Sequence, residues 1–306
     1  SPVTSERDGQ TKSAASRRPD FASRFTRCIS RGMTPTPPKL FDRSLHRRNR
    51  DRAALRYDDY AFLKQRESSH LIERLEDVSR QFDRALDLGA HDGRLAKMLA
   101  GHPQVGSVDA AEVSAPFRQV IAKKGLSAID LDEEEISVEP GSYDLVTSVL
   151  SLHWVNDLPG SLIQIRQALK PDGLFLGCLF GGGTLTELRT SFLEAETELA
   201  GGAGARISPL PALQDMAGLM QRAGFALPVV DLETVTVRYG DPFKLLSDIR
   251  GMGEQAAFAA NEKLPRRPLS RRLLARMADI YAERFADADG RLRATFNVIW
   301  LSGGAP

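Results

Sequence analysis

The stretch ALDLGAHDGRLAKMLA, residues 85–100, has the form of a strand that runs into a glycine turn and then into a helix. Apolar residues lead into Asp87 and Gly89, and the segment 94–100 has helical spacing. A nucleotide-binding loop usually has a second glycine two residues after the first, and His91 stands there instead. The stretch therefore predicts a cofactor loop in which one glycine has been replaced.

Strand-like and helix-like segments alternate along the rest of the chain. We expect strands at 84–88, 106–110, 126–131, 143–150, 173–180, 229–240 and 291–303. We expect helices at 94–100, 115–123, 158–169, 211–223, 242–260 and 269–286. This alternation predicts an α/β fold, an open and mostly parallel sheet with helices on both faces. Ligands of such sheets bind beyond the carboxyl ends of the strands, where the loop after Gly89 would lie.

The composition excludes several classes of partner and site. The net charge of the 306 residues is +1, which gives no global reason to expect nucleic acid or an anionic membrane as partner. No apolar run reaches the roughly 18–20 residues that cross a bilayer. Cys28 and Cys178 lie far apart, and together with five scattered histidines they predict neither a disulfide framework nor a zinc site.

The chain divides into three parts by composition. We predict a disordered basic arm at 1–38, a helical segment at 39–83, and a main domain at 84–306 with a helical insertion at about 242–286. The arm is either an organellar transit peptide or unstructured sequence upstream of a natural start at Met33. The compartment therefore stays open between a bacterial cytoplasm, which we expect, and a mitochondrial matrix.

The beginning of the chain is basic. Residues 1–58 hold 14 Lys and Arg against 6 Asp and Glu, and the remainder holds 27 against 34. A cluster of four arginines, Arg47, Arg48, Arg50 and Arg52, suits contact with phosphates or an acidic partner. Such a run is more often the solvated face of a helix, and we expect a solvated face here.

Acidic residues follow three successive predicted strands. Asp87 and Asp109 end the first and the second strand, and Asp132 follows the third. In a nucleoside site of this architecture, the second acid accepts the two ribose hydroxyls, and a polar group after the third strand meets the adenine amino group. Together with the turn at Gly89 and Gly93, these positions predict a ligand that contains a nucleoside.

A dinucleotide is not the expected ligand. Asp92 would place a negative charge where a pyrophosphate lies, and like charges repel each other. The segment GGGTLTELR, residues 181–189, is rich in glycine but has no lysine for a phosphate. An acid at the end of the first strand instead suits a cationic ligand, such as a sulfonium with an amino-acid tail.

Longer segments resemble a known family. LDLG with Asp109 and Asp132, YDLVTSVLSLHWVNDLPG, QALKPDGLFLGCLFGG and TLTELR resemble the class I S-adenosylmethionine-dependent methyltransferases. The likeness covers about residues 40–300 and is strongest to the branch of malonyl carrier-protein methyltransferases and of a mitochondrial complex I assembly factor. It implies a Rossmann-like fold, a seven-stranded mixed sheet with an antiparallel last strand, and S-adenosylmethionine as cofactor.

The resemblance also implies cofactor-binding residues. Asp87 and Gly89 would line the methionine moiety, Asp109 the ribose and Asp132 the adenine. The full set of expected positions is Asp87, Gly89, Ala90, His91, Gly93, Asp109, Ala110, Asp132 and Val149. The ring of His91 could stack on the cofactor, turn outward to solvent, or block tight binding.

The segment LSLHWVND after the fourth strand carries the acceptor-side candidates Ser151, His153, Trp154 and Asn156. Methyl transfer from a sulfonium depends mainly on alignment, and a carboxylate acceptor needs no base, whereas an amine does. The segment lacks the Asn/Asp-Pro-Pro-Tyr sequence of amino-methylating enzymes, which favours an oxygen acceptor. His153 could be a base or a packed residue, and Trp154 could cover the site or belong to the core.

Three functions fit these patterns. The first, which we predict, is a methyltransferase that acts on a carboxylate, a protein or a carrier-protein-bound acceptor. The second, implied by the resemblance, is an assembly factor that binds S-adenosylmethionine and hydroxylates an arginine of a complex I subunit. The third is a non-catalytic binding protein. Hydroxylation requires oxygen and a metal or other redox centre, and no two-histidine, one-carboxylate spacing is visible, so we predict no metal ligands.

Overall fold

The structure is a computed structural model. It describes residues 39–202, 204, 206–259 and 268–306. The described residues belong to one compact unit. The predicted disordered arm at 1–38, together with Cys28 and Met33, lies outside the described residues.

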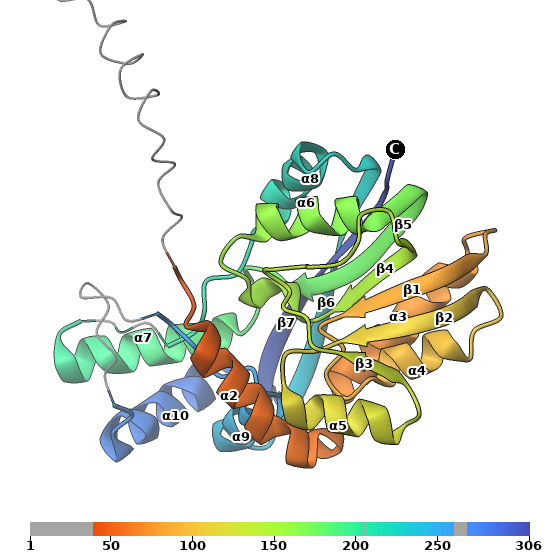
Figure 1. The fold of residues 1–306 in the computed structure, drawn as a ribbon. Helices are drawn as coiled ribbons and strands as arrows, with labels where there is room; N and C mark the ends of the chain where they lie inside the picture. Colours follow the sequence, from red (N-terminus) through yellow and green to blue (C-terminus); the bar gives the residue numbers. More distant parts are fainter. Residues whose placement is uncertain (1–38, 203, 205, 260–267) are drawn as a thin grey trace, which may run out of the picture. The chain divides into compact units, whose positions relative to one another are not determined.

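Seven strands form one mixed sheet in the described part of the chain (Figure 1). They are β1 (Phe82–Leu88), β2 (Val105–Ala111), β3 (Ser127–Ile129), β4 (Tyr143–Val149), β5 (Leu169–Phe180), β6 (Ala226–Tyr239) and β7 (Leu292–Gly304). Their order is β3-β2-β1-β4-β5-β7-β6; β1 to β5 pair in parallel, and β7 runs antiparallel to both of its neighbours. The predicted α/β fold with an antiparallel last strand is confirmed.

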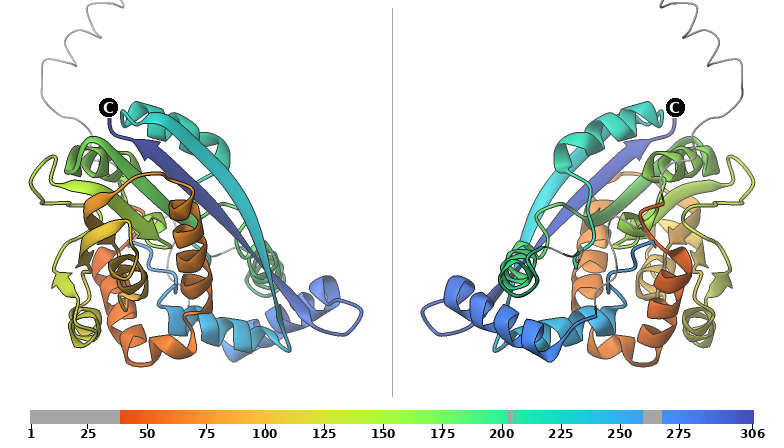
Figure 2. Two further views of the ribbon diagram at one scale, coloured as in Figure 1. Left: turned by 90° about the vertical axis from the view of Figure 1, so that its right-hand side faces the viewer. Right: turned by 90° about the vertical axis from the view of Figure 1, so that its left-hand side faces the viewer.

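Helices lie on both faces of this sheet, as Figure 1 and Figure 2 show. They are α2 (Arg43–Ala53), α3 (Phe62–Glu76), α4 (Arg94–Ala100), α5 (Ala115–Lys123), α6 (Leu158–Ala168), α7 (Thr186–Ala200), α8 (Leu213–Arg222), α9 (Pro242–Met252) and α10 (Arg271–Phe285). The core accordingly has two main parts. Ala85 of β1 belongs to the part under α3 and α4, and its neighbour Leu86 belongs to the part under α6 and α8. The alternation follows from the two-residue period of a strand.

Most predicted boundaries agree with the structure, and α4 and α5 have the predicted bounds. Helix α9 ends at Met252, well before the predicted end at residue 260, because Gly253 takes a φ of 81° and caps the helix. The predicted strand 126–131 shortens to the three residues of β3. Strand β5 begins at Leu169, earlier than the predicted residue 173.

The N-terminal helices bring side chains to the carboxyl ends of the strands. Helix α2 contacts α5 and α9, a 3-10 helix η1 (Ala54–Asp59) follows it, and α3 packs on α4. Leu63, Leu71 and Leu75 of α3 are buried in the core, as their helical spacing in the sequence indicates. This segment therefore covers the region where the sequence predicts a ligand.

Helices α9 and α10 stand between β6 and β7, where the sequence predicts a helical insertion, and α10 packs against α7. The division of the chain into an arm, a helical segment and a main domain stays a prediction. Cys178 is buried and has a free thiol. Within the described ranges, no helix combines the length and the apolar character needed to cross a membrane.

Candidate functional site

The loop between β1 and α4, residues 89–93, keeps the backbone of a cofactor loop although one glycine is replaced. Gly89, His91 and Gly93 have φ angles of 71°, 52° and 74°. The N–H groups of Gly89 and Ala90 donate to the carbonyl oxygen of Ala111, the last residue of β2, at 3.0 and 2.9 Å. Histidine enters the left-handed region more readily than most residues, so the replacement preserves the turn.

A buried ammonium group lies beside this loop. Lys64 of α3 is 2% exposed and donates to the carbonyl oxygens of Gly89, at 3.0 Å, and Val149, at 2.6 Å. The Asp87 carboxylate interacts with this ammonium, and its Oδ2 atom has no hydrogen-bond partner among the described residues. Burial lowers the pKa of Lys64 and raises the pKa of Asp87 to about 6. Two carbonyls and one carboxylate thus form an acceptor set for an ammonium group.

A second buried cation lies between two acids. Arg50 of α2 is 1% exposed, and its guanidinium is 3.1 Å from Glu112 and 2.6 Å from Glu133. Glu112 directly follows β2, and Glu133 lies beyond β3. Burial disfavours the charged guanidinium, but Glu112 and Glu133 outweigh it and raise the pKa of Arg50. The arginine therefore stays charged and fills the space between the two acids.

The imidazole of His91 joins the two cations. Its Nδ1 atom is 3.0 Å from the Arg50 guanidinium and 3.1 Å from the Lys64 ammonium. The ring stacks on Tyr57 of η1 with 5.4 Å between the centroids. Burial, helped by Arg50 and Lys64, lowers the pKa of His91 well below its ordinary value, so the ring is neutral. The ring is buried, so the expectation that it turns outward to solvent is wrong.

Asp109, the acid predicted for the ribose, lies within β2 and not at its end. Asp109 does not end β2, because the strand continues to Ala111, and its side chain accepts hydrogen bonds from Arg84, at 2.7 Å, and Tyr143, at 3.0 Å. The residue at the strand end is Glu112, which is fully buried. The predicted strand was too short by one residue at this end, and the position of Asp109 at the strand end is therefore a wrong prediction.

The other predicted cofactor positions differ in whether a side chain or only the backbone could contact a ligand. Asp132 follows β3 as predicted, and its carboxylate is 2.6 Å from the Arg43 guanidinium of α2. Ala90 and Ala110 have their side chains in the hydrophobic core, so only their backbone atoms can contact a ligand. Gly93 is the N-cap of α4 and allows the chain to enter that helix.

An apolar cavity of about 470 Å³, which we call the acceptor cavity, lies beside the 3-10 turn η2 (Leu152–Trp154) after β4. Its polar lining residues are His153, Trp154, Thr184, Arg206, Ser208, Arg250, Glu254 and Gln255, and the remaining lining residues are apolar and include side chains of α7, α9 and α10. The Glu254 carboxylate accepts from His153 Nε2 at 2.9 Å and from Trp154 Nε1 at 2.8 Å. The volume falls in the range of small-molecule sites.

The acceptor-side candidates separate in space, and Asn156 accepts hydrogen bonds from the backbone N–H groups of Leu40 and Phe41. Ser151 lies on the side of the cofactor loop, where its hydroxyl donates to Glu133 at 2.6 Å. His153 lines the acceptor cavity. Trp154 is 3% exposed and stacks on His46 of α2 with 4.7 Å between the centroids. Trp154 therefore belongs to the core and also forms a wall of the cavity. The two alternatives expected from the sequence, a core residue and a cover of the site, both describe it.

Sequence reasoning missed five residues of this site. They are Arg50, Lys64, Glu112, Glu133 and Glu254. Arg47, Arg48 and Arg52 are exposed as predicted, but the prediction of a solvated face is wrong for Arg50. A signal was present, because Arg50 stands four residues after His46 and three before Ala53, and all three share the buried face of α2.

Asp87→Asn is expected to stabilise the free protein at pH 7 by about 1–3 kcal/mol. The folded-state pKa of Asp87, about 6, lies above its unfolded value, so this group contributes stability at low pH that is lost as the pH rises toward 6. Urea unfolding at several pH values should show the difference between variant and wild type growing from pH 4 to pH 6. Equal stability of variant and wild type at pH 7 would show that burial of the ionised Asp87 carboxylate does not destabilise the fold.

Comparison with known proteins places the chain in a family. The sequence matches the methyltransferase domain family over residues 57–228. It is 35% identical over 306 residues to a Mus musculus protein named arginine-hydroxylase NDUFAF5, mitochondrial, covering 99% of this chain and 85% of that protein. It is 31% identical over 283 residues to the malonyl-[acyl-carrier protein] O-methyltransferase of Halorhodospira halophila, covering 90% of this chain and 93% of that protein.

A solved structure with a similar fold is that of Haemonchus contortus phosphoethanolamine N-methyltransferase 2 in complex with S-adenosyl-L-methionine. The TM-score is 0.52 at 19% identity, covering 83% of this chain and 57% of that one. The strand order, the left-handed loop after β1 and the relatives over nearly the whole chain all agree with the resemblance seen in the sequence. The chain belongs to the class I S-adenosylmethionine-dependent methyltransferase family.

Proposed function

We propose that the chain binds S-adenosylmethionine at the carboxyl ends of β1, β2 and β4 and methylates an acceptor in the acceptor cavity. Asp87 and the carbonyls of Gly89 and Val149 suit the ammonium of the amino-acid tail. Glu112 suits the two ribose hydroxyls, and Asp132 suits the adenine amino group. When bound, the cofactor supplies a methyl group that is activated by the positive sulfur.

The acceptor groups fit this cofactor, but cationic side chains of the protein now occupy them, and Arg43 pairs with Asp132. The Lys64 ammonium occupies the acceptor set of Asp87, and the Arg50 guanidinium lies against Glu112. Both side chains are long and come from α2 and α3, which cover the strand ends. The proposal therefore includes the displacement of Lys64 and Arg50 when the cofactor binds.

The acceptor cavity is the observation that carries the transferase proposal. Ser151 on the cofactor side and His153 on the cavity wall belong to the same short turn after β4. An acceptor in this cavity would lie next to the methyl donor, and alignment of the two reactants accounts for most of the acceleration in such a displacement. The apolar lining and Arg250 suit an acyl chain or a protein side chain that ends in a carboxylate, for which no base is needed.

Glu254 favours a second candidate function. This carboxylate is fixed at the cavity wall by His153 and Trp154, and a carboxylate pairs well with a guanidinium. The Mus musculus relative is named an arginine hydroxylase. In this second proposal, an arginine of a partner protein enters the acceptor cavity and is hydroxylated, a reaction that requires oxygen and a redox centre.

The first test is calorimetric titration of the purified chain with S-adenosylmethionine and, separately, S-adenosylhomocysteine. Binding of either at micromolar concentration supports the cofactor site, and the absence of binding to both refutes it. Incubation with methyl-labelled cofactor and either a malonyl carrier protein or an arginine peptide, with and without oxygen and iron, then separates the reactions. A label on the product supports methyl transfer, and an added oxygen atom without label supports hydroxylation.

Glu254→Gln is expected to leave the affinity for S-adenosylmethionine within about twofold, because the substitution is on the acceptor side. For a carboxylate acceptor, kcat/KM should rise, by up to about tenfold, since a like charge is removed from the cavity wall. A fall of about tenfold or more would instead support the guanidinium acceptor, because its ion pair is lost. Steady-state kinetics on both acceptors make the comparison, with far-UV circular dichroism as the control for folding.

A further inference from the structure

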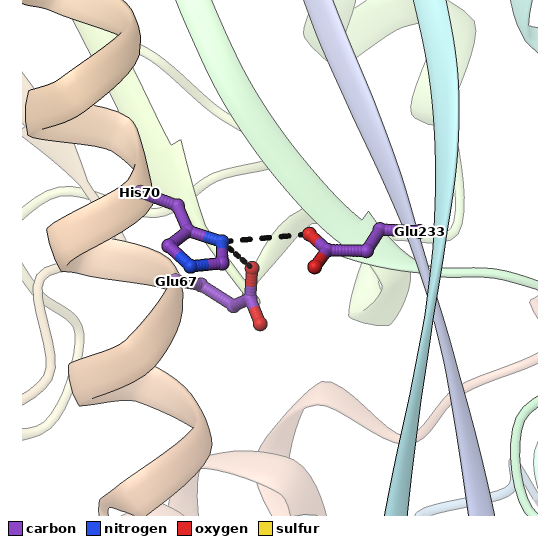
Figure 3. A group of neighbouring side chains, drawn as sticks. All are labelled: Glu67, His70 and Glu233. Carbon is purple, nitrogen blue, oxygen red and sulfur yellow. Dashed lines mark ion pairs between the residues drawn. The ribbon is translucent and has the colours of Figure 1, made fainter.

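Apart from the site described above, three side chains of α3 and β6 meet at one point. Glu67 and His70 lie one turn apart on α3, and Glu233 lies on β6, one of the two edge strands of the sheet. Figure 3 shows both carboxylates directed at the imidazole. The three nearest donor atoms lie within 4.8 Å of one another.

The separations exceed those of good hydrogen bonds. His70 Nδ1 is 3.8 Å from Glu67 Oε2 and 3.4 Å from Glu233 Oε2, whereas an N–H to oxygen hydrogen bond has a length of about 2.7–3.2 Å. In a tetrahedral zinc site with bonds of about 2.0–2.2 Å, two ligand atoms stand roughly 3.3–3.6 Å apart. The His70–Glu233 separation lies in this range and the His70–Glu67 separation lies slightly above it, so small side-chain shifts would bring the donors around one ion.

Arg66 holds the two carboxylates in this arrangement. Its guanidinium donates to Oε1 of Glu67 at 2.5 Å and also to Oε1 of Glu233. Both Oε2 atoms are left on the side of His70. One guanidinium against two carboxylates leaves one negative charge when the imidazole is neutral, so the cluster retains attraction for a cation.

A second observation is the state of Glu67. Its side chain is 0% exposed, and its Oε2 atom has no hydrogen-bond partner among the described residues. A buried carboxylate oxygen without a donor costs free energy, and an ion at this position would remove that cost.

We propose that Glu67, His70 and Glu233 bind one divalent transition-metal ion of the zinc type. One imidazole nitrogen and two carboxylate oxygens form a donor set that such ions accept, and a water completes four-coordination. The side chains of His70 and Glu233 are 31% and 30% exposed, which leaves a path for the ion from solvent. The ion would join α3 to β6 and so fix the helix that carries Lys64. The sequence could not indicate this site, because Glu233 is remote from α3 in the chain.

The test is titration of untagged, chelator-treated full-length protein with Zn²⁺, followed by calorimetry and by metal analysis after gel filtration. We expect about one ion per chain and a higher unfolding temperature with Zn²⁺. Glu67→Gln keeps the hydrogen bond from Arg66, and His70→Gln changes a partly exposed residue, so at least one variant should fold. Either should weaken Zn²⁺ binding by about tenfold or more.

The matched control is Asp231→Asn. Asp231 lies on the same strand and pairs with Arg74 of α3 at 3.1 Å, so the control breaks another ion pair between α3 and β6. Zn²⁺ affinity should be unchanged in this variant. If the wild type does not bind Zn²⁺, the proposal is overturned, because the hydrogen bonds from Arg66 are then sufficient for the two carboxylates. Binding that survives both ligand substitutions would also overturn it, since the ion would have other ligands.

Discussion

Arg50→Ala is expected to destabilise the free protein by about 3–5 kcal/mol, the usual effect of removing one partner from a buried ion pair. The substitution leaves the carboxylates of Glu112 and Glu133 buried without their shared cation. Chemical denaturation at pH 7 measures the effect. Arg47→Ala on the exposed face of the same helix is the control and should change stability by less than about 0.5 kcal/mol.

The pH dependence of stability should differ between the wild type and the Arg50→Ala variant. In the wild type, burial tends to raise the pKa of Glu133, but Arg50 and Arg43 outweigh it and hold that pKa well below its ordinary value. This group therefore stabilises the fold above the unfolded pKa, and its contribution is lost as the pH falls. Without Arg50, Arg43 still pairs with Glu133 at 2.8 Å, but Glu112, whose pKa burial already raises in the wild type, loses the cation that opposes this shift. The variant should therefore regain stability relative to the wild type as the pH falls toward 5.

The same variant tests the displacement of Arg50 by the cofactor. If the guanidinium competes for Glu112, its removal should increase the affinity for S-adenosylmethionine by about tenfold, because the free energy of displacing it is no longer spent. Weaker binding would mean that Arg50 contacts the cofactor instead. A destabilisation below about 1 kcal/mol would show that the two acids are not dependent on Arg50 in the free protein.

Glu112→Gln is expected to lower the affinity for S-adenosylmethionine by about tenfold or more, which corresponds to roughly 1.5–3 kcal/mol for hydrogen bonds to a charged group. Glu112 stands at the end of β2, fully buried, where the ribose of a nucleoside ligand is held in this architecture. Calorimetric titration measures the loss, and the unfolding temperature of the variant controls for folding.

Asp109→Asn is the matched control on the same strand. Its side chain lies with Arg84 and Tyr143, so the affinity for S-adenosylmethionine should stay within about twofold of the wild type. The opposite result, a loss with Asp109→Asn and none with Glu112→Gln, would restore the residue that the sequence pattern favours for the ribose. Losses of similar size in both variants would refute the assignment of this role to one acid.

Both predictions depend on one property of the site. In the free protein, the acceptor groups of the candidate cofactor site are already paired with cationic side chains of the protein itself. Lys64 and Arg50 are cations on helices that cover the strand ends, and they make contacts of the kind that a cationic ligand would make. Cofactor binding and the position of α2 and α3 should therefore be coupled. The candidate metal site on α3 lies three residues from Lys64, so an ion there would act on the same helix.

The sequence by itself determined the fold, because its signals are local and repeated. Strand and helix periods alternate through the chain, and Gly89 and Gly93 mark a turn that needs a left-handed backbone. The family resemblance added the antiparallel last strand. The loop after β1 and the acid after β3 were also predicted, since both directly follow strands in sequence.

Only the tertiary structure decided which side chains face the site. The end of β2 depends on pairing with β1, which extends to Ala111 and so exchanges Asp109 for Glu112. Arg50 and Lys64 look like ordinary charged positions on helices, and their burial follows from how α2 and α3 pack over the sheet. Hydrophobic periodicity predicts apolar burial, whereas a buried charge is decided by partners that are distant in sequence and meet only in the folded chain.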